Sequence, residues 1–134
     1  KITNGQGLVA GQDQTQTTGY AKYAYGPITV GYQESHNNAR AGSGTEGRDQ
    51  VAEMWAIAYS AGDMSFSYAE SNFVNEAVSD LAASAEQELE AIQASYTMGA
   101  MTLMGSFSEG ANIGATATGG KNYEETSVAV NFTF

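Results

Sequence analysis

A repeat of about 36 residues constrains the fold of this chain more than any other feature. The repeated segments start at Gly26, Gly62 and Gly99, which lie 36 and 37 residues apart. A tyrosine stands three residues before each of these glycines, at Tyr23, Tyr59 and Tyr96. Each unit consists of an alternating apolar/polar stretch, a glycine turn, a second alternating stretch and a long polar segment. Successive side chains of a strand point to opposite faces, so each unit predicts a hairpin of two strands.

The repeat predicts seven antiparallel strands, with tight turns at one end of the sheet and long loops at the other. We expect strands near 17–25, 28–35, 50–60, 64–71, 88–98, 101–109 and 123–134. Short turns fall around residues 26–27, 61–63 and 99–100, and the long connections cover 36–49, 72–87 and 110–122. Residues 1–16 lie outside the repeat and are interpreted as a loop on the long-loop side. The whole of residues 1–134 then forms one β domain, or the C-terminal part of one.

One segment has helical rather than strand-like spacing. Apolar residues recur at Val74, Val78, Leu81, Leu89 and Ile92 in a stretch rich in Ala and Glu. We therefore expect a short helix at about 76–84, inside a long loop. From residue 88 onward the repeat favours a strand, with a helix as the competing interpretation.

One face of the predicted sheet is apolar and carries aromatic residues towards both strand ends. These aromatics are Tyr23, Tyr59, Tyr96, Phe132 and Phe134 near the tight turns, and Tyr32, Trp55, Tyr68 and Phe107 further along the strands. Two such belts are typical of the two membrane–water interfaces of a transmembrane β-barrel. The alternative is that they form the core of a soluble barrel. We expect an all-β transmembrane antiparallel barrel.

The opposite face is small and polar, which is typical of the wall of a water-filled pore. Its predicted pore-lining residues are Lys22, Thr29, Gln33, Ser65, Ser67, Gln93, Ser95, Thr97, Thr102, Ser106, Asn131 and Thr133. A closed barrel of about eight strands must fill its interior with side chains, and these residues would leave holes. They suit a wider lumen. Lys22 is the cation expected inside the pore, although a lysine reaching up to the membrane interface explains it nearly as well.

Five glutamates share the phase of the apolar face and lie just beyond its aromatic residues. They are Glu34, Glu53, Glu70, Glu90 and Glu109. They predict an outward-facing acidic collar at the long-loop end, where Ca²⁺ or Mg²⁺ could bridge carboxylates to lipopolysaccharide phosphates. A solvated rim that keeps the strand ends wet, or a subunit interface, is the alternative interpretation.

Composition excludes several other functions. The 134 residues have no Cys, one His and a net charge of −10, which argues against thiol chemistry, a multi-His metal site and a nucleic-acid partner. No apolar run approaches the roughly 20 residues of a transmembrane helix. We expect His36 to be a solvated loop residue rather than part of a catalytic group.

The segment from Tyr123 to Phe134, with its alternating apolar residues and terminal Phe, resembles the last strand of Gram-negative outer-membrane proteins. The opening Gly-Pro-Ile-Thr-Val-Gly-Tyr at 26–32, repeated after short turns, resembles the general porins of α-proteobacteria. The resemblance covers roughly residues 17–134. It implies the C-terminal half of a 16-stranded barrel with short periplasmic turns and long extracellular loops.

The resemblance also implies how such a protein works. It implies a homotrimer in the outer membrane of a Gram-negative bacterium, which passes small hydrophilic solutes and ions by diffusion. Lipopolysaccharide and phospholipid would surround the barrel, and the last strand would engage the barrel assembly machinery. The loop that narrows the family's pore belongs to the N-terminal half, so no constriction residue is carried over to this chain. No cofactor is expected apart from a possible divalent cation at the collar.

Three other functions remain open at this point. The first is a complete eight-stranded barrel with a structural or adhesive role, in which residues 1–12 supply an extra strand. The second is an outer-membrane enzyme, which would need a clustered acid–base group. The third is a soluble or fibre-forming β protein. The expected function is the diffusion channel, without enzymatic activity.

Overall fold

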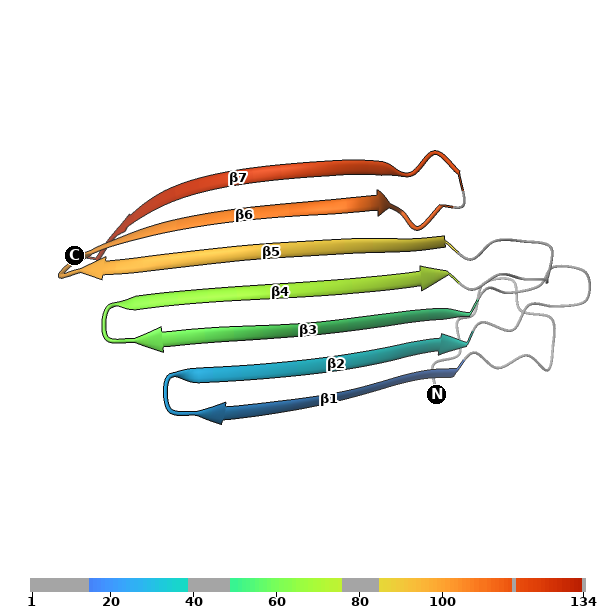
Figure 1. Cartoon of the computed structure of the whole chain (residues 1–134), viewed down its shortest axis with the longest axis horizontal. Coiled ribbons are helices and arrows are strands. Elements are labelled where there is room, and N and C mark those ends of the chain that lie inside the picture. Colours follow the sequence, from blue (N-terminus) through green and yellow to red (C-terminus); the bar gives the residue numbers. More distant parts are fainter. Residues whose placement is uncertain (1–14, 39–48, 76–84, 117, 134) are drawn as a thin grey trace, which may run out of the picture.

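The computed structural model describes residues 15–38, 49–75, 85–116 and 118–133. They form seven strands, each paired antiparallel with its neighbour in the sequence, in one sheet of order β1-β2-β3-β4-β5-β6-β7 (Figure 1). The strands are β1 Thr15–Tyr25, β2 Ile28–Asn38, β3 Gln50–Ala61, β4 Met64–Asn75, β5 Ala85–Met98, β6 Met101–Ile113 and β7 Lys121–Phe132. The predicted all-β class and strand number are confirmed, and the sheet is not closed. No helix among these residues is long and apolar enough to cross a membrane.

Three tight turns lie at one end of the sheet, and each depends on a glycine. Gly26, Gly62 and Gly99 have φ of 56°, 57° and 59°, values in the left-handed region that other residues seldom adopt. Pro27, Asp63 and Ala100 follow them without a positive φ. A glycine with positive φ at the first central position is the arrangement of a type II′ turn, whose twist matches that of the flanking strands. The repeated glycines therefore fix the register of three hairpins.

The strands extend further into the predicted long connections than the alternation indicated. β2 continues to Asn38, β4 to Asn75 and β6 to Ile113, while β5 begins at Ala85 and β7 at Lys121. Polar residues continue the ladder there, as in the pairs Asn37↔Gln50 and Asn72↔Glu88. The predicted connections 36–49, 72–87 and 110–122 were therefore too long, because these polar strand ends lack an apolar alternation.

The structure decides between strand and helix for the part of the ambiguous segment that it describes. Residues from Ala85 to Met98 are all strand, so the predicted strand near 88–98 is confirmed and the helical interpretation of its first residues is wrong. Pairing of β5 with both β4 and β6 outweighs the helix propensity of its Ala and Glu residues. The helix predicted at 76–84 lies outside the described residues.

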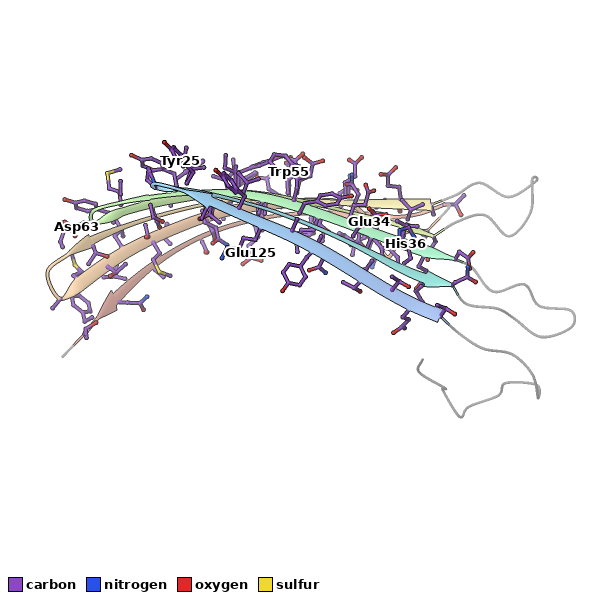
Figure 2. The ribbon with its side chains drawn as sticks, turned by 90° about the horizontal axis from the view of Figure 1, so that it is seen from below. Tyr25, Glu34, His36, Trp55, Asp63 and Glu125 are labelled. Carbon is purple, nitrogen blue, oxygen red and sulfur yellow. The ribbon has the colours of Figure 1, made fainter. Side chains whose placement is uncertain are left out.

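The sheet is a single arched layer without a core. Tyr25 and Trp55 lie on its convex side and Glu125 lies on its concave side (Figure 2). Only Ala85, Gly110 and Ala115 are buried among the described residues. Large apolar side chains are exposed instead: Tyr25 is 75% exposed and Phe66 is 48% exposed. Since an apolar sheet face needs a second layer to cover it, the convex face requires something outside these strands.

Candidate functional site

The convex face carries a continuous apolar band, because the pairing register aligns apolar residues across neighbouring strands. One row of directly opposed residues runs through Tyr23, Val30, Ile57, Tyr68, Ile92 and Phe107. The next row towards the tight turns begins with Tyr25, Ile28, Tyr59 and Phe66. The predicted aromatic residues of both belts lie on this face, except Phe134, which is outside the described residues.

A glutamate bounds the apolar band on each strand from β2 to β7. Counted from the tight turns along the convex face, it is the first charged residue of the strand, namely Glu34, Glu53, Glu70, Glu90, Glu109 and Glu124. We call these six residues the glutamate collar. Five were predicted, and Glu124 was missed although its phase relative to Val128 and Val130 could have identified it. The collar therefore follows the same edge of the apolar band across six strands.

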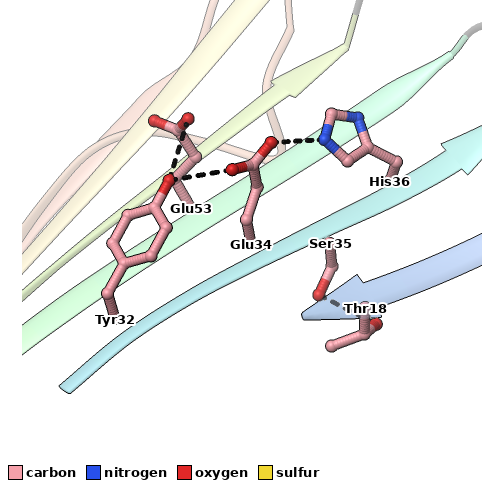
Figure 3. A network of polar contacts seen from close by, with 6 residues as sticks. All are labelled: Thr18, Tyr32, Glu34, Ser35, His36 and Glu53. Atoms are coloured by element: carbon pink, nitrogen blue, oxygen red, sulfur yellow. Dashed lines mark hydrogen bonds and ion pairs between the residues drawn. The ribbon is translucent and has the colours of Figure 1, made fainter. Parts of the chain in front are cut away.

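Aromatic side chains next to the collar point their polar atoms at it. The Tyr32 hydroxyl donates hydrogen bonds to Glu34 at 3.0 Å and to Glu53 at 3.4 Å (Figure 3). Glu70 accepts hydrogen bonds from Trp55 Nε1 at 3.2 Å and from the Tyr68 hydroxyl at 3.3 Å. The ring bodies thus border the apolar band while their polar ends face the collar. Amphipathic rings adopt this orientation where an apolar phase meets water.

His36 lies in β2 and not in the loop where the sequence placed it. Its Nε2 atom is 2.5 Å from Glu34 Oε1, so the imidazole extends the polar contacts of Tyr32, Glu34 and Glu53 (Figure 3). The prediction of a loop histidine is therefore wrong, because β2 runs two residues past His36.

The collar places like charges side by side. Glu34 is directly opposite Glu53, and Glu70, Glu90, Glu109 and Glu124 form one row of successive cross-strand partners. Directly opposed like charges destabilise a sheet. Within the described ranges no group of three or more His, Asp or Glu residues is arranged to hold a metal ion. Cation binding by the collar stays a prediction.

The concave face carries small and polar side chains. By register or strand phase, this face holds all the predicted pore-lining residues: Lys22, Thr29, Gln33, Ser65, Ser67, Gln93, Ser95, Thr97, Thr102, Ser106, Asn131 and Thr133. Several pair through hydroxyls across strands, as in Ser65–Ser95 at 2.7 Å and Ser106–Ser127 at 2.7 Å. In such pairs each hydroxyl has a hydrogen-bond partner without any charged group, and the face stays hydrophilic.

A row of the smallest side chains hollows the middle of the concave face. Five residues, Gly31, Ala56, Ala69, Ala91 and Ser108, stand in register between Lys22 on β1 and Glu125 on β7. A hollow of about 380 Å³ opens over the part of this row between Lys22 and Ala91, and Gln93 is among its other lining residues. Sequence reasoning missed Glu125, although its phase relative to Ser127 places it on this face.

The concave face also carries larger apolar residues. Met104 lies towards the tight turns, opposite Ser95 and Ala129, and others lie towards the long-loop end, where sequence reasoning did not expect them. Leu89 and Tyr123 flank Gly110 as its cross-strand partners. A Cβ at Gly110 would collide with the Tyr123 ring, and would lie 2.7 Å from Ile113 Cδ1 and 2.8 Å from Leu89 Cδ2. The absence of a side chain at Gly110 therefore allows these three residues to pack together.

Comparisons of this chain with family models, with curated proteins and with solved structures find no match. The functional argument therefore rests on the two faces of the sheet and on the contacts at their edges.

Proposed function

We propose that this chain forms part of the wall of an outer-membrane porin, a water-filled channel for passive diffusion of ions and small hydrophilic solutes. The observation that carries the proposal is that the apolar face of the curved sheet is the convex one and the polar face is the concave one. The convex face is apolar and bounded by aromatic rings, and the concave face is small and polar (Figure 2). Lipid would supply the missing apolar layer on the outside, and water would fill the inside.

The strand lengths fit this environment. A transmembrane β-strand needs about 9–11 residues to cross the hydrocarbon region at a tilt of about 45°. The seven strands have between 11 and 14 residues, so each is long enough to cross, and the longest strands extend beyond the hydrocarbon region. The glutamate collar then lies at the level of the headgroups on the long-loop side, where carboxylates remain hydrated.

The directions of the edge strands bear on how such a barrel would close. β1 and β7 run the same way, because seven strands alternate in direction along the sheet. Antiparallel pairing at both edges therefore requires an odd number of further strands between them. Nine more strands would give the 16 of a porin barrel wide enough for an aqueous channel. This parity agrees with the resemblance to the C-terminal half of a general porin.

The remaining parts of the proposal follow from this placement. The three tight turns face the periplasm and the long loops face the exterior of a Gram-negative cell. Phospholipid and lipopolysaccharide contact the convex face, and lipopolysaccharide phosphates meet the glutamate collar, with Ca²⁺ or Mg²⁺ between them. The barrel assembles as a homotrimer, and the β7 segment is the part that the barrel assembly machinery engages.

Solute entry into vesicles tests this function. The protein, extracted folded from its membrane, is reconstituted into liposomes that are then diluted into isotonic solutions of sugars of increasing size. A porin predicts fast swelling with small sugars and a progressive loss of rate as the sugar grows. Liposomes that hold the folded protein yet swell no faster than empty ones would instead indicate a closed barrel with a structural or adhesive role.

A further inference from the structure

The buried residues of the described sheet gather in one place. Ala85, Gly110 and Ala115 lie at the long-loop end. Ala85 is 4% exposed and Ala115 is 2% exposed. Ala85 is the cross-strand partner of Asn75, which Gln50 opposes on its other side. Ala85 and Gly110 share the strand phase of the concave face with Asn75 and Gln50. Something packs against that face at its long-loop end, although the rest of the sheet is open.

The packed segment is the end of β6 together with the start of the connection to β7, residues 112–116, which we call the strap. A chain of side-chain amides leads to it across three strands. Asn37 Nδ2 donates to Gln50 Oε1 at 3.0 Å, and Gln50 Nε2 donates to Asn75 Oδ1 at 3.0 Å. Asn75 Nδ2 then donates to the carbonyl oxygen of Ala115 at 3.1 Å. We call Asn37, Gln50 and Asn75 the amide ladder.

Strand β5 holds the strap at two more points. The backbone N–H of Gly114 donates to Gln87 Oε1 at 2.8 Å, and Asn112 Nδ2 donates to the carbonyl oxygen of Glu86 at 2.6 Å. Gln87 is two residues from both Ala85 and Leu89 and therefore lies on the concave face. The strap is thus joined to β4 and β5, neither of which is its neighbour in the sequence.

The strap also has an internal structure that defines its shape. Asn112 has a φ of 51° and Ala115 a φ of 44°, and the Ala115 N–H donates to the Asn112 carbonyl at 2.9 Å. Asn112 N–H donates to Asn122 Oδ1 at 3.0 Å, and the Thr116 hydroxyl donates to Asn112 Oδ1 at 3.3 Å. Asparagine tolerates the left-handed region better than most residues, which suits it to this corner.

We infer that the strap is a fixed, inward-folded element that narrows the pore entrance over β4 and β5 and is held there by the amide ladder and Gln87. The inference that it lies over an entrance rests on the proposed function. The position of the strap on the concave face is independent of the proposed function. Residues 112–116 carry no charged side chain, and neither do the anchors Asn75 and Gln87, so the strap restricts solutes by size. Selection by charge then depends on other residues of the wall.

Thiol labelling tests whether the strap is fixed, and the 134 residues of this chain contain no Cys that would compete for the label. Ala115→Cys puts a thiol at the buried position, and Thr118→Cys puts one at an exposed position of the same connection. In the folded full-length protein, a hydrophilic maleimide should label Cys at 118 quickly and Cys at 115 slowly. Equal fast labelling at both positions would overturn the inference.

The anchors are tested in the Ala115→Cys background. Each neutral hydrogen bond biases an equilibrium by roughly fivefold, so Asn75→Ala with Gln87→Ala should speed labelling by roughly tenfold or more. The matched control, Gln33→Ala with Gln93→Ala, removes two amides of the concave face that lie away from the strap and should leave the labelling rate unchanged. An equal increase in both backgrounds would contradict anchoring by Asn75 and Gln87. If the double variant does not fold, Gln87→Ala alone replaces it in the labelling experiment and should also speed labelling.

Conductance measurements test the narrowing role of the strap separately from the proposed porin function. If the proposed function holds, the anchor variant should admit larger sugars or polymers than the unmodified channel, because its entrance is wider. An unchanged size cut-off in a conducting channel would overturn the narrowing role while leaving the porin proposal intact. No conductance from either protein, with protected labelling at position 115, would contradict the porin proposal and leave the fixed strap supported.

Discussion

Trp55 Nε1 donates a hydrogen bond of 3.2 Å to Glu70, its direct cross-strand partner on the convex face. The Trp55 ring also lies against the ring of Tyr68, with centroids 5.1 Å apart and planes inclined by 55°. The indole therefore has an apolar side towards the band and a polar side towards the glutamate collar. This pair marks the level at which the apolar band ends.

The depth of Trp55 can be measured directly, because it is the single Trp of the chain. In bilayers, its fluorescence should be quenched more strongly by lipids brominated near the headgroup than by lipids brominated near the ends of the acyl chains. Moving the Trp with Trp55→Phe and Phe66→Trp should reverse this order, because position 66 is closer to the middle of the band. The same order for both proteins would contradict the assigned level.

The assignment of the two faces predicts opposite responses at neighbouring positions. Phe66→Arg places a charge on the convex face and should destabilise the barrel by about 2–4 kcal/mol, as charges near the bilayer midplane do. Ser67→Arg places the same charge on the concave face, where water solvates it, and should change unfolding little while altering ion selectivity. Denaturant unfolding in lipid vesicles measures both, and equal losses of stability would show the faces to be wrong.

Lys22 and Glu125 stand in one register row on the concave face and predict opposite shifts in ion selectivity. Lys22→Gln removes a cation from the lumen wall and should shift the reversal potential in a salt gradient towards cation preference. Glu125→Gln should shift it towards anion preference. Glu124→Gln, which removes the same charge from the convex face, is the control and should leave the reversal potential near that of the unmodified channel.

Two glycines of β6 should respond differently to the same substitution. At Gly110 a Cβ would collide with the packed side chains of Tyr123, Leu89 and Ile113, so Gly110→Ala should cost about 1–3 kcal/mol, as overpacking does. At Gly105 a Cβ would find only the Ser127 carbonyl oxygen at 4.0 Å, so Gly105→Ala should be tolerated. The free energies of unfolding of the two variants decide this, and equal stability would argue against packing at Gly110.

The opposed carboxylates of the collar predict a dependence on divalent cations. Added Ca²⁺ or Mg²⁺ should raise the thermal stability of the unmodified protein, because the ions relieve repulsion between cross-strand glutamates. A variant with Glu34, Glu53, Glu70 and Glu90 changed to Gln should gain less. Equal gains in melting temperature would identify the collar as a solvated rim.

Strand number, hairpin register and the two faces were predictable from the sequence, because alternation and the glycines at 26, 62 and 99 are local signals. The ends of the strands were not, since polar residues such as Asn37 and Gln50 look the same in a loop and in a ladder. Their pairing partners lie on other strands. His36 was misplaced for the same reason.

The strap was beyond sequence reasoning for a different physical reason. Its anchors, Asn75 and Gln87, bond to residues 40 and 27 positions away, and neither anchor belongs to a motif. The faces of Glu124 and Glu125 could instead be predicted from strand phase alone. Glu124 is an even number of positions from Val128 on the convex face, and Glu125 is an even number of positions from Ser127 on the concave face.

Single-channel conductance tests the central claim most directly. The protein, extracted folded from its native membrane, is added to a planar lipid bilayer under an applied voltage. A wide pore lined by the concave face predicts large ohmic current steps, and a trimer predicts that the steps arrive in threes. Folded protein that inserts into the bilayer without conducting would contradict the claim that this sheet lines an open channel.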